Sequence, residues 1–241
     1  MPRLVRVPLA ALSSGPRPLD DKTAHYLCDV LRLAPGDAFV AFDASAGVEA
    51  DAVLLDASSC TLAEPRAAAR VQSSGITLVQ ALGKGDKTEQ VVRSATALGV
   101  DELHLVESAR SVARAGDRAD SKHARLESIA LDAARQSTRG DVPRIFGPYA
   151  FARALEDLQD RAGLKLCLVP GAAASLAALV RAWTASTPLA LIVGPEGGLA
   201  EDEIARAEAA GFVPARFGEL VLRTEIAGIA ALGALLLLRE S

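Results

Sequence analysis

The alternation of apolar stretches with helical segments after residue 75 constrains the fold more than any other feature of this sequence. Short apolar runs predict buried strands at residues 76–82, 103–107, 164–169, 189–193 and 213–217. Helices are predicted between and after them, at residues 88–98, 121–137, 151–161, 175–183, 201–210 and 224–238. Because strands separated by helices pair in parallel, we expect an α/β domain whose mostly parallel sheet is covered on both faces.

The first 70 residues follow a different pattern. Four short apolar stretches predict strands at residues 4–7, 38–42, 50–55 and 60–62. One helix is predicted at about residues 22–32, with Asp21 as its N-cap. Short strands with a single helix are typical of a small β-barrel. A join rich in Ala, Ser, Pro and Gly at residues 63–75 separates the two patterns, so we expect domains at residues 1–72 and 73–241.

Composition argues against a membrane or secreted protein. The longest apolar run, residues 226–238, is too short to span a bilayer and has the length of a core helix. Pro8 interrupts the short apolar stretch near the N-terminus, which is unlike a signal peptide, so we expect a cytoplasmic protein. Cys28, Cys60 and Cys167 are far apart and form no metal-ligand spacing with the three histidines. We therefore expect buried thiols and no metal.

Charge is distributed unevenly, although the net charge is only −4. Residues 33–65 contain six acidic and no basic side chains, whereas residues 1–32 and 66–144 are locally positive. A protein that binds nucleic acid over most of its surface would be more basic overall. Local arginine clusters that touch one particular RNA are compatible with this balance.

Three loops that follow predicted strands are candidates for a ligand site, since open parallel sheets bind ligands at the carboxyl ends of their strands. They are Gly-Pro-Glu-Gly-Gly at residues 194–198, Val-Pro-Gly at 169–171, and Gly-Glu-Leu-Val-Leu-Arg-Thr at 218–224. Glycines let the backbone approach a ligand closely, but the first loop also fits a tight strand-to-helix turn. Neither that loop nor Gly83-Lys84-Gly85 has the spacing of a phosphate-binding or dinucleotide-binding motif.

Two of these loops resemble the signatures of a known enzyme family. Residues 191–199 (LIVGPEGGL), followed by Glu201-Asp202-Glu203-Ile204, resemble the first signature of the RsmE-type 16S rRNA uridine-N3 methyltransferases. Residues 220–225 (LVLRTE) resemble the second. The resemblance covers nearly the whole chain in the family's order. It extends to residues 30–33 with 35–37 and 42–43 near the N-terminus, and to residues 84–87 with 98–100 after the join.

The resemblance implies an N-terminal PUA-like β-barrel that binds RNA, followed by a SPOUT domain of the α/β class with a C-terminal trefoil knot. It also implies a homodimer whose active sites border the subunit interface. The cofactor that it implies is S-adenosylmethionine, held by the three loops. On this resemblance the cofactor-binding residues are Leu168, Val169, Pro170, Gly194, Pro195, Glu196, Gly197, Gly198, Gly218, Leu220, Val221, Leu222 and Thr224.

The reaction implied by the resemblance is methylation of N3 of a uridine in 16S rRNA of the small ribosomal subunit, the uridine equivalent to U1498 near the decoding site. Uracil N3 is a poor nucleophile until its proton leaves, and attack on a methyl group then needs in-line positioning. A cation near O2 or O4 would stabilise the uracil anion, and Arg223 is the candidate catalytic residue. Its alternative role is a structural ion pair with Glu225. Glu196 either faces the cofactor or caps the following helix.

The candidate RNA-binding residues are basic side chains in both predicted domains. Because aromatic residues make up only 4% of the chain, we expect RNA to be held by phosphate contacts and shape rather than by base stacking. The candidates are Arg3, Arg6, Arg32, Lys84, Lys87, Arg110, Arg114, Arg135 and Arg139.

Three positions depart from the family pattern, namely Arg135 on the long helix, Val169 before Pro170, and Ile226 after the second signature. None of them lies in the glycine loop. Two other functions stay open on the sequence. One is a SPOUT paralogue that methylates a different RNA nucleotide, and the other is a non-catalytic RNA-binding factor in ribosome assembly.

Overall fold

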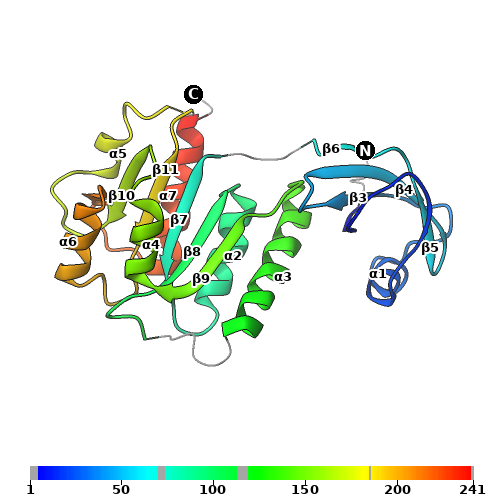
Figure 1. Cartoon of the computed structure of the whole chain (residues 1–241), viewed down its shortest axis with the longest axis horizontal. Coiled ribbons are helices and arrows are strands. Elements are labelled where there is room, and N and C mark those ends of the chain that lie inside the picture. Colours follow the sequence, from blue (N-terminus) through cyan, green and yellow to red (C-terminus); the bar gives the residue numbers. More distant parts are fainter. Residues whose placement is uncertain (1–4, 70–73, 113–118, 185, 240–241) are drawn as a thin grey trace. The chain divides into compact units, whose positions relative to one another are not determined.

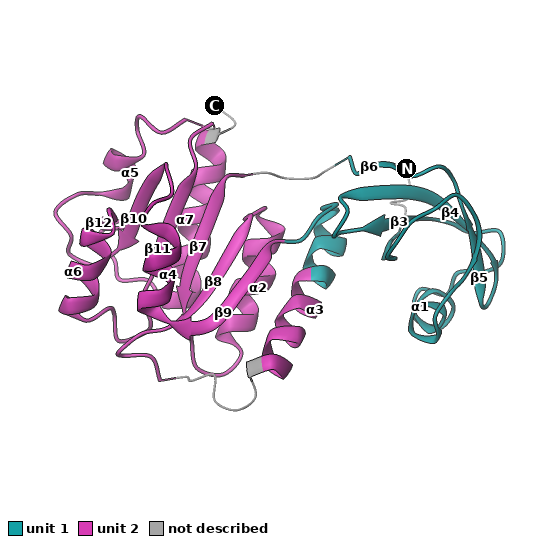
Figure 2. Ribbon diagram, viewed as in Figure 1, with its two compact units in different colours: residues 1–72, 131–142 teal, residues 73–130, 143–241 magenta. Residues whose placement is uncertain are grey.

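A computed structural model of the chain describes residues 5–69, 74–112, 119–184 and 186–239. It divides into two compact units, one made of residues 1–72 and 131–142 and the other of residues 73–130 and 143–241 (Figure 2). The segment 131–142 therefore lies in the first unit, although the domain prediction places it in the second domain. The predicted boundary at residue 72 falls within residues 70–73, outside the described residues.

The first unit is built on a six-stranded sheet with the order β1-β3-β4-β5-β2, in which β6 also pairs with β4. Among the described strand pairs of this sheet, β1–β3 is parallel and the others are antiparallel. Its core contains Leu27, Phe39 and Leu54, each almost fully buried. The elements are β1 (Arg6–Pro8), β2 (Gly15–Pro18), α1 (Asp21–His25), η1 (Tyr26–Val30), β3 (Ala38–Asp43), β4 (Val48–Asp56), β5 (Ser59–Leu62) and β6 (Arg66–Ala67).

The predicted helix of this unit differs from the observed one in two ways. Asp20 rather than Asp21 is the N-cap, because the Asp20 carboxylate accepts a hydrogen bond from the Thr23 backbone N–H at 2.8 Å. The helix also changes from α to π geometry at Tyr26. Strands β2 and β6 were not predicted, because β2 contains two prolines and β6 has only two residues, both exposed.

The second unit contains a six-stranded sheet, order β12-β10-β11-β7-β8-β9, in which every pair is parallel (Figure 1). This confirms the predicted parallel α/β architecture. The elements are β7 (Ile76–Ala81), α2 (Lys87–Ala97), β8 (Glu102–Glu107), α3 (Ala119–Ser137), β9 (Arg144–Ala150), α4 (Phe151–Leu158), β10 (Leu164–Leu168), α5 (Leu176–Leu179), β11 (Leu189–Val193), α6 (Glu201–Ala209), β12 (Val213–Ala215) and α7 (Thr224–Arg239). The end of α3, residues 131–137, belongs to the first unit.

Helices cover both faces of this sheet, as the apolar strands require. Leu78 and Leu191 point into a core shared with side chains of α2, α3, α5 and α7. Their neighbours Val79 and Ile192 point the other way, into a core shared with α4 and α6. Successive side chains of a strand face opposite sides of the sheet, so fully apolar strands need cover on both sides. No helix among the described residues is long and apolar enough to cross a membrane.

The prediction for this unit missed one strand and placed the ends of α5 and β12 too late, since the helix predicted at residues 175–183 is only α5, Leu176–Leu179. Strand β9 was missed because Gly147-Pro148 interrupts its apolar pattern; proline is tolerated there because β9 lies at the edge of the sheet. Strand β12 ends at Ala215 instead of residue 217. Arg216 and Phe217 therefore belong to the loop that leads toward α7.

Candidate cofactor pocket

The three glycine-containing loops meet around one pocket of about 320 Å³. They follow β10, β11 and β12, which are neighbours in the parallel sheet, so their carboxyl ends reach the same edge. The lining residues are Leu168, Val169, Pro170, Gly171, Val193, Gly194, Pro195, Glu196, Gly198, Arg216, Phe217, Gly218, Glu219, Leu220, Val221, Leu222, Arg223, Thr224 and Ala227. The pocket lies within the range of volumes typical of small-molecule sites.

Each loop turns through a glycine in the left-handed backbone region, with φ of 79° at Gly171, 69° at Gly198 and 73° at Gly218. A Cβ atom added at any of these three positions would meet nothing within 4 Å. Gly194 is different, because a Cβ there would lie 3.0 Å from the Leu199 Cγ atom. The left-handed turns bring bare backbone to the pocket, where a ligand can approach it closely.

The structure brings together all the predicted cofactor-binding residues except Gly197, along with Arg223. Gly197 does not line the pocket, because it packs against Arg110; a Cβ at Gly197 would lie 3.3 Å from the Arg110 Cβ. The sequence did not single out Arg216, Phe217 or Ala227. Arg216 and Phe217 were assigned to a strand that ends two residues earlier, so only the correct end of β12 could have revealed them.

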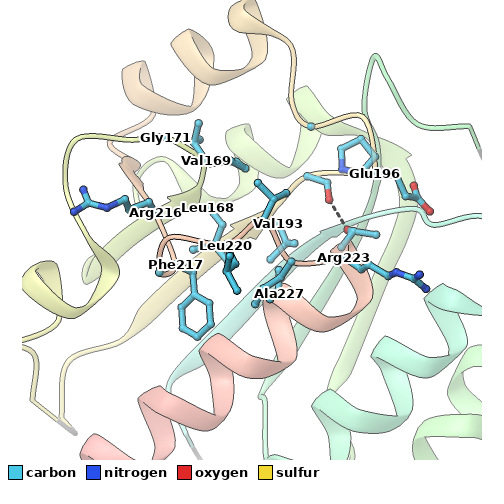
Figure 3. A pocket seen from close by; sticks show the side chains of 18 of the residues that line it. Leu168, Val169, Gly171, Val193, Glu196, Arg216, Phe217, Leu220, Arg223 and Ala227 are labelled. Carbon is cyan, nitrogen blue, oxygen red and sulfur yellow. Dashed lines mark hydrogen bonds between the residues drawn. The ribbon is translucent and has the colours of Figure 1, made fainter.

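A buried hydrogen-bond chain joins two of the loops to the sheet. The Thr224 hydroxyl donates to the Gly194 carbonyl oxygen at 2.5 Å, shown as a dashed line in Figure 3, and accepts from Gln80 Nε2 at 3.0 Å. Gln80 also donates to the Ala81 carbonyl oxygen at 3.2 Å. Because Gln80 is the penultimate residue of β7 and Thr224 begins α7, the chain of bonds holds the glycine loop against the first turn of α7.

Charged side chains occupy opposite ends of the pocket (Figure 3). At one end Arg216 donates to the carbonyl oxygens of Ala172, at 3.1 Å, and Ala173, and lies 3.7 Å from a Glu219 carboxylate oxygen. It thereby holds the loop after β10. Glu196 and Arg223 lie at the other end. Partial burial opposes ionisation of Glu196, but hydrogen bonds from Lys87 and neighbouring backbone outweigh it and lower the pKa of this carboxyl.

Arg223 is exposed, and its guanidinium pairs with no carboxylate among the described residues. The ion pair with Glu225, the alternative role considered for Arg223, is not formed. Glu225 instead lies 3.6 Å from Lys87 Nζ. Figure 3 shows the Arg223 side chain extending on the Glu196 side of the pocket, away from Phe217 and Leu220. Its guanidinium is therefore available to an anionic group outside the chain.

Several candidate RNA-binding residues are engaged within the protein. Arg6 is largely buried and pairs with Glu49 at 2.8 Å, and Arg139 is 4% exposed and pairs with Asp141 at 2.7 Å. The Arg135 guanidinium stacks 4.4 Å above the centre of the Tyr26 ring, within the first unit.

Other candidates reach the surface. Arg32 and Lys84 are exposed. Arg110 is exposed as well and donates to the carbonyl oxygens of Gly197, at 3.1 Å, and Leu199, at 3.4 Å. Arg3 and Arg114 lie outside the described residues.

A second group of titratable residues lies at the opposite edge of the sheet, away from the pocket. His104 is 1% exposed and hydrogen-bonds to the Tyr149 hydroxyl and to Glu102, which also pairs with Arg144 and Arg161. Burial lowers the pKa of His104 and raises the pKa of Tyr149 to about 12. Every polar end in the group has a partner, which is typical of a structural cluster. The described residues contain no grouping of His, Cys, Asp and Glu that could hold a metal ion.

Comparisons with known proteins agree with this geometry. Residues 71–236 match the RNA methyltransferase domain family, and residues 19–62 match the RNA methyltransferase PUA domain. Ribosomal RNA small subunit methyltransferase E of Bacillus subtilis is 31% identical over 222 residues, which cover 88% of this chain and 86% of that protein.

Solved structures are similar over nearly the full length. The crystal structure of ribosomal RNA small subunit methyltransferase E from Neisseria gonorrhoeae, bound to S-adenosyl methionine, superposes with a TM-score of 0.87 at 28% identity and covers 98% of each chain. A putative methyltransferase of Legionella pneumophila in complex with the same cofactor gives a TM-score of 0.88 at 25% identity, again over 98% of each chain.

Proposed function

The chain belongs to the family of ribosomal RNA small subunit methyltransferases E, and on this premise we propose that it transfers a methyl group from S-adenosylmethionine to N3 of a uridine in 16S rRNA. The proposed target is the uridine equivalent to U1498. The observation that carries the proposal is the pocket formed by the three loops, which is lined by residues of both family signatures.

The residues present fit S-adenosylmethionine. Left-handed glycines leave open space beside the backbone in each of the three loops. Leu220, Leu222 and Phe217 supply apolar walls for an adenine ring. The ionised carboxylate of Glu196 complements a positively charged methyl donor. When bound, this cofactor supplies an electrophilic methyl group, and the chain's own residues orient it.

The uracil must lose its N3 proton before it can attack, and Arg223 is placed to favour that loss. Its guanidinium lies at the rim of the pocket, exposed and unpaired among the described carboxylates. A planar cation with several donors stabilises the negative charge that spreads onto uracil O2 or O4. We therefore propose Arg223 as the catalytic residue that stabilises the uracil anion.

We assign the RNA contacts to exposed basic residues on each unit, namely Arg32, Lys84 and Arg110. Arg6 and Arg139 are left out because both are buried in ion pairs. In this proposal residues 1–72 bind RNA as a PUA-like domain and residues 73–241 form the catalytic SPOUT domain with its trefoil knot. The enzyme acts in the cytoplasm on 16S rRNA, within the small subunit.

We further propose that the protein is a homodimer that packs partly through α7. That helix exposes Ile226 in its first turn and Leu237 and Leu238 in its last turn, each about half-exposed or more, and large exposed apolar side chains favour burial against a partner. Light scattering at micromolar concentration should give twice the 25.0 kDa chain mass. A stable monomer under those conditions would contradict the proposal.

Mass-spectrometric mapping of rRNA from a strain lacking this gene tests the function. The target uridine should lack its N3 methyl group and regain it when the gene is restored. A methyl group missing from another nucleotide would identify an enzyme with a different target. Unchanged methylation, together with no binding of S-adenosylmethionine by calorimetry, would favour the non-catalytic assembly factor.

A further inference from the structure

The Gly-Lys-Gly-Asp-Lys segment at residues 83–87, whose last residue begins α2, packs beside the cofactor pocket. A Cβ atom added at Gly83 would lie 2.8 Å from the Lys87 Cβ, so the lysine stem crosses the bare backbone of this glycine. The Gly83 N–H also donates to the Thr88 hydroxyl at 3.3 Å. These contacts hold Lys87 across the turn, and only glycine at position 83 leaves room for its side chain.

The ammonium group of Lys87 reaches two segments, the loop after β11, which lines the pocket, and the first turn of α7. Lys87 Nζ lies 2.9 Å from Glu196 Oε1 in the loop after β11, and 3.6 Å from Glu225 Oε2 in the first turn of α7. The backbone N–H of Lys84 donates to the same Glu196 oxygen at 3.4 Å. The Glu225 side chain is 11% exposed, and its Oε2 atom accepts no hydrogen bond from the described residues.

We propose that Lys87 is a positioning residue, which ties the glycine loop to the start of α7 and so sets the shape of the cofactor pocket. This inference rests on the proposed function, because the pocket it shapes is the site assigned to S-adenosylmethionine. Lys87 touches neither substrate nor cofactor in this role. It acts through Glu196, which lines the pocket, and through Glu225, which follows Arg223 and Thr224 by one turn or less.

Repulsion between like charges explains why a cation is needed between Glu196 and Glu225. Without Lys87, two carboxylates would face each other beside the pocket with no cation between them, and they would repel. The hydrogen bond to Glu196 is the main cause of the raised pKa of Lys87. The cation is therefore retained throughout the neutral range, and the two carboxylates stay together.

A phosphate contact, the role first considered for Lys87, fits the surroundings less well. The charges of Lys87, Glu196 and Glu225 add up to a local net charge of −1, which does not attract an RNA phosphate. Lys84, three residues earlier, is exposed, and no carboxylate among the described residues pairs with its side chain. The two neighbouring lysines thus have separate roles, and they provide a matched pair for a test.

The test measures S-adenosylmethionine affinity by calorimetry in Lys87→Met, Lys87→Arg and the control Lys84→Met. We expect Lys87→Met to lose affinity roughly tenfold, since a charge-assisted hydrogen bond that shapes the site is removed. In kinetics, KM for the cofactor should rise while kcat at saturation changes little. Lys87→Arg should restore most of the affinity, and Lys84→Met should bind the cofactor like the wild type. If Lys87→Met does not fold, Lys87→Gln takes its place.

The pH dependence separates this role from a merely structural one. In the wild type, cofactor affinity should persist on acidification until Glu196 protonates at its lowered pKa. In Lys87→Met that pKa rises, so affinity should begin to fall at a higher pH. The double variant Lys87→Met/Glu196→Gln should lose less than the sum of the two single losses, because both changes break one contact.

Three results would overturn the inference. The first is wild-type cofactor affinity in Lys87→Met. The second is a loss of cofactor affinity in Lys87→Met that Lys87→Arg does not restore and that does not change with pH. The third is a loss of about one unit of salt dependence in RNA binding by Lys87→Met, which would make Lys87 a phosphate contact instead. A wild-type protein that binds no S-adenosylmethionine would refute the proposed function itself, which distinguishes the two failures.

Discussion

Replacing Thr224 with valine probes the hydrogen-bond chain that closes the pocket. Valine keeps the shape of the side chain but removes the hydroxyl that donates to Gly194 and accepts from Gln80. Thr224 is 6% exposed and Gln80 is 2% exposed. Water therefore has little access to Gln80 after the substitution, whereas the Gly194 carbonyl oxygen lines the pocket and can find water.

The magnitude follows from these surroundings. Leaving a buried polar group without a partner costs about 1–3 kcal/mol. The Gln80 amide keeps its bond to the Ala81 carbonyl oxygen, so the loss at Gln80 lies at the lower end of that range. We therefore expect Thr224→Val to lower the free energy of unfolding by about 1 kcal/mol. For a chain of this size that corresponds to a fall in Tm of about 2–4 °C.

The assay is differential scanning calorimetry with and without S-adenosylmethionine. Affinity for the cofactor should fall about tenfold, because the glycine loop is no longer held by α7 and must be ordered on binding. Thr77→Val is the matched control, since Thr77 is half-buried in β7 and its hydroxyl makes no hydrogen bond within the described residues. If Thr224→Val melts like Thr77→Val and binds the cofactor normally, the argument from this hydrogen-bond chain is refuted.

Three further predictions follow from the same structure. Arg223→Lys should bind cofactor and RNA nearly normally but transfer methyl about 10²–10³ times more slowly, with a defect that shrinks as pH rises; an early-melting variant with normal single-turnover rates would contradict this. Gly198→Ala should weaken cofactor binding roughly tenfold, because its left-handed φ of 69° strains a loop that lines the pocket, whereas Gly211→Ala, also left-handed but outside the pocket, should leave affinity unchanged. Burial lowers the pKa of His104, so on acidification the unfolded chain protonates at this residue at a higher pH than the folded chain does. Melting curves should therefore show stability falling as the pH drops below about 6.5. In His104→Gln the fall in stability between about pH 6.5 and pH 4.5 should become shallower, whereas the loss of stability caused by protonation of Glu102 below about pH 4.5 should remain. An unchanged fall between these two pH values would show that His104 does not titrate as inferred.

The sequence by itself determined the architecture of the second unit and the location of its pocket. Apolar strands that alternate with helices can bury both faces only in a parallel sheet, and loops at the carboxyl ends of such strands gather at one edge. Glycines at residues 171, 198 and 218 could be placed at close-approach positions from the printed sequence alone. The motifs around residues 191–199 and 220–225 then identified the family, and the comparisons confirm it.

Element ends and irregular elements were predicted less well, because tertiary contacts decide them. Strand β9 contains Gly147-Pro148, and its place at the sheet edge is what allows a strand there. The end of β12 at Ala215 moves Phe217 from a strand into the pocket wall. In both cases the local pattern is overridden by pairing with a neighbour that lies far away in the chain.

Which charged residue serves which purpose was decided only by the tertiary structure. A lysine or arginine has the same charge wherever it stands in the sequence, but its role depends on the carboxylates that folding brings near. Folding pairs Arg6 with Glu49 and brings Lys87 to Glu196, 109 residues apart. It leaves Arg223 without a carboxylate among the described residues, although Glu225 stands two positions away. Sequence spacing cannot determine such pairings, because they depend on distances between loops that follow separate strands.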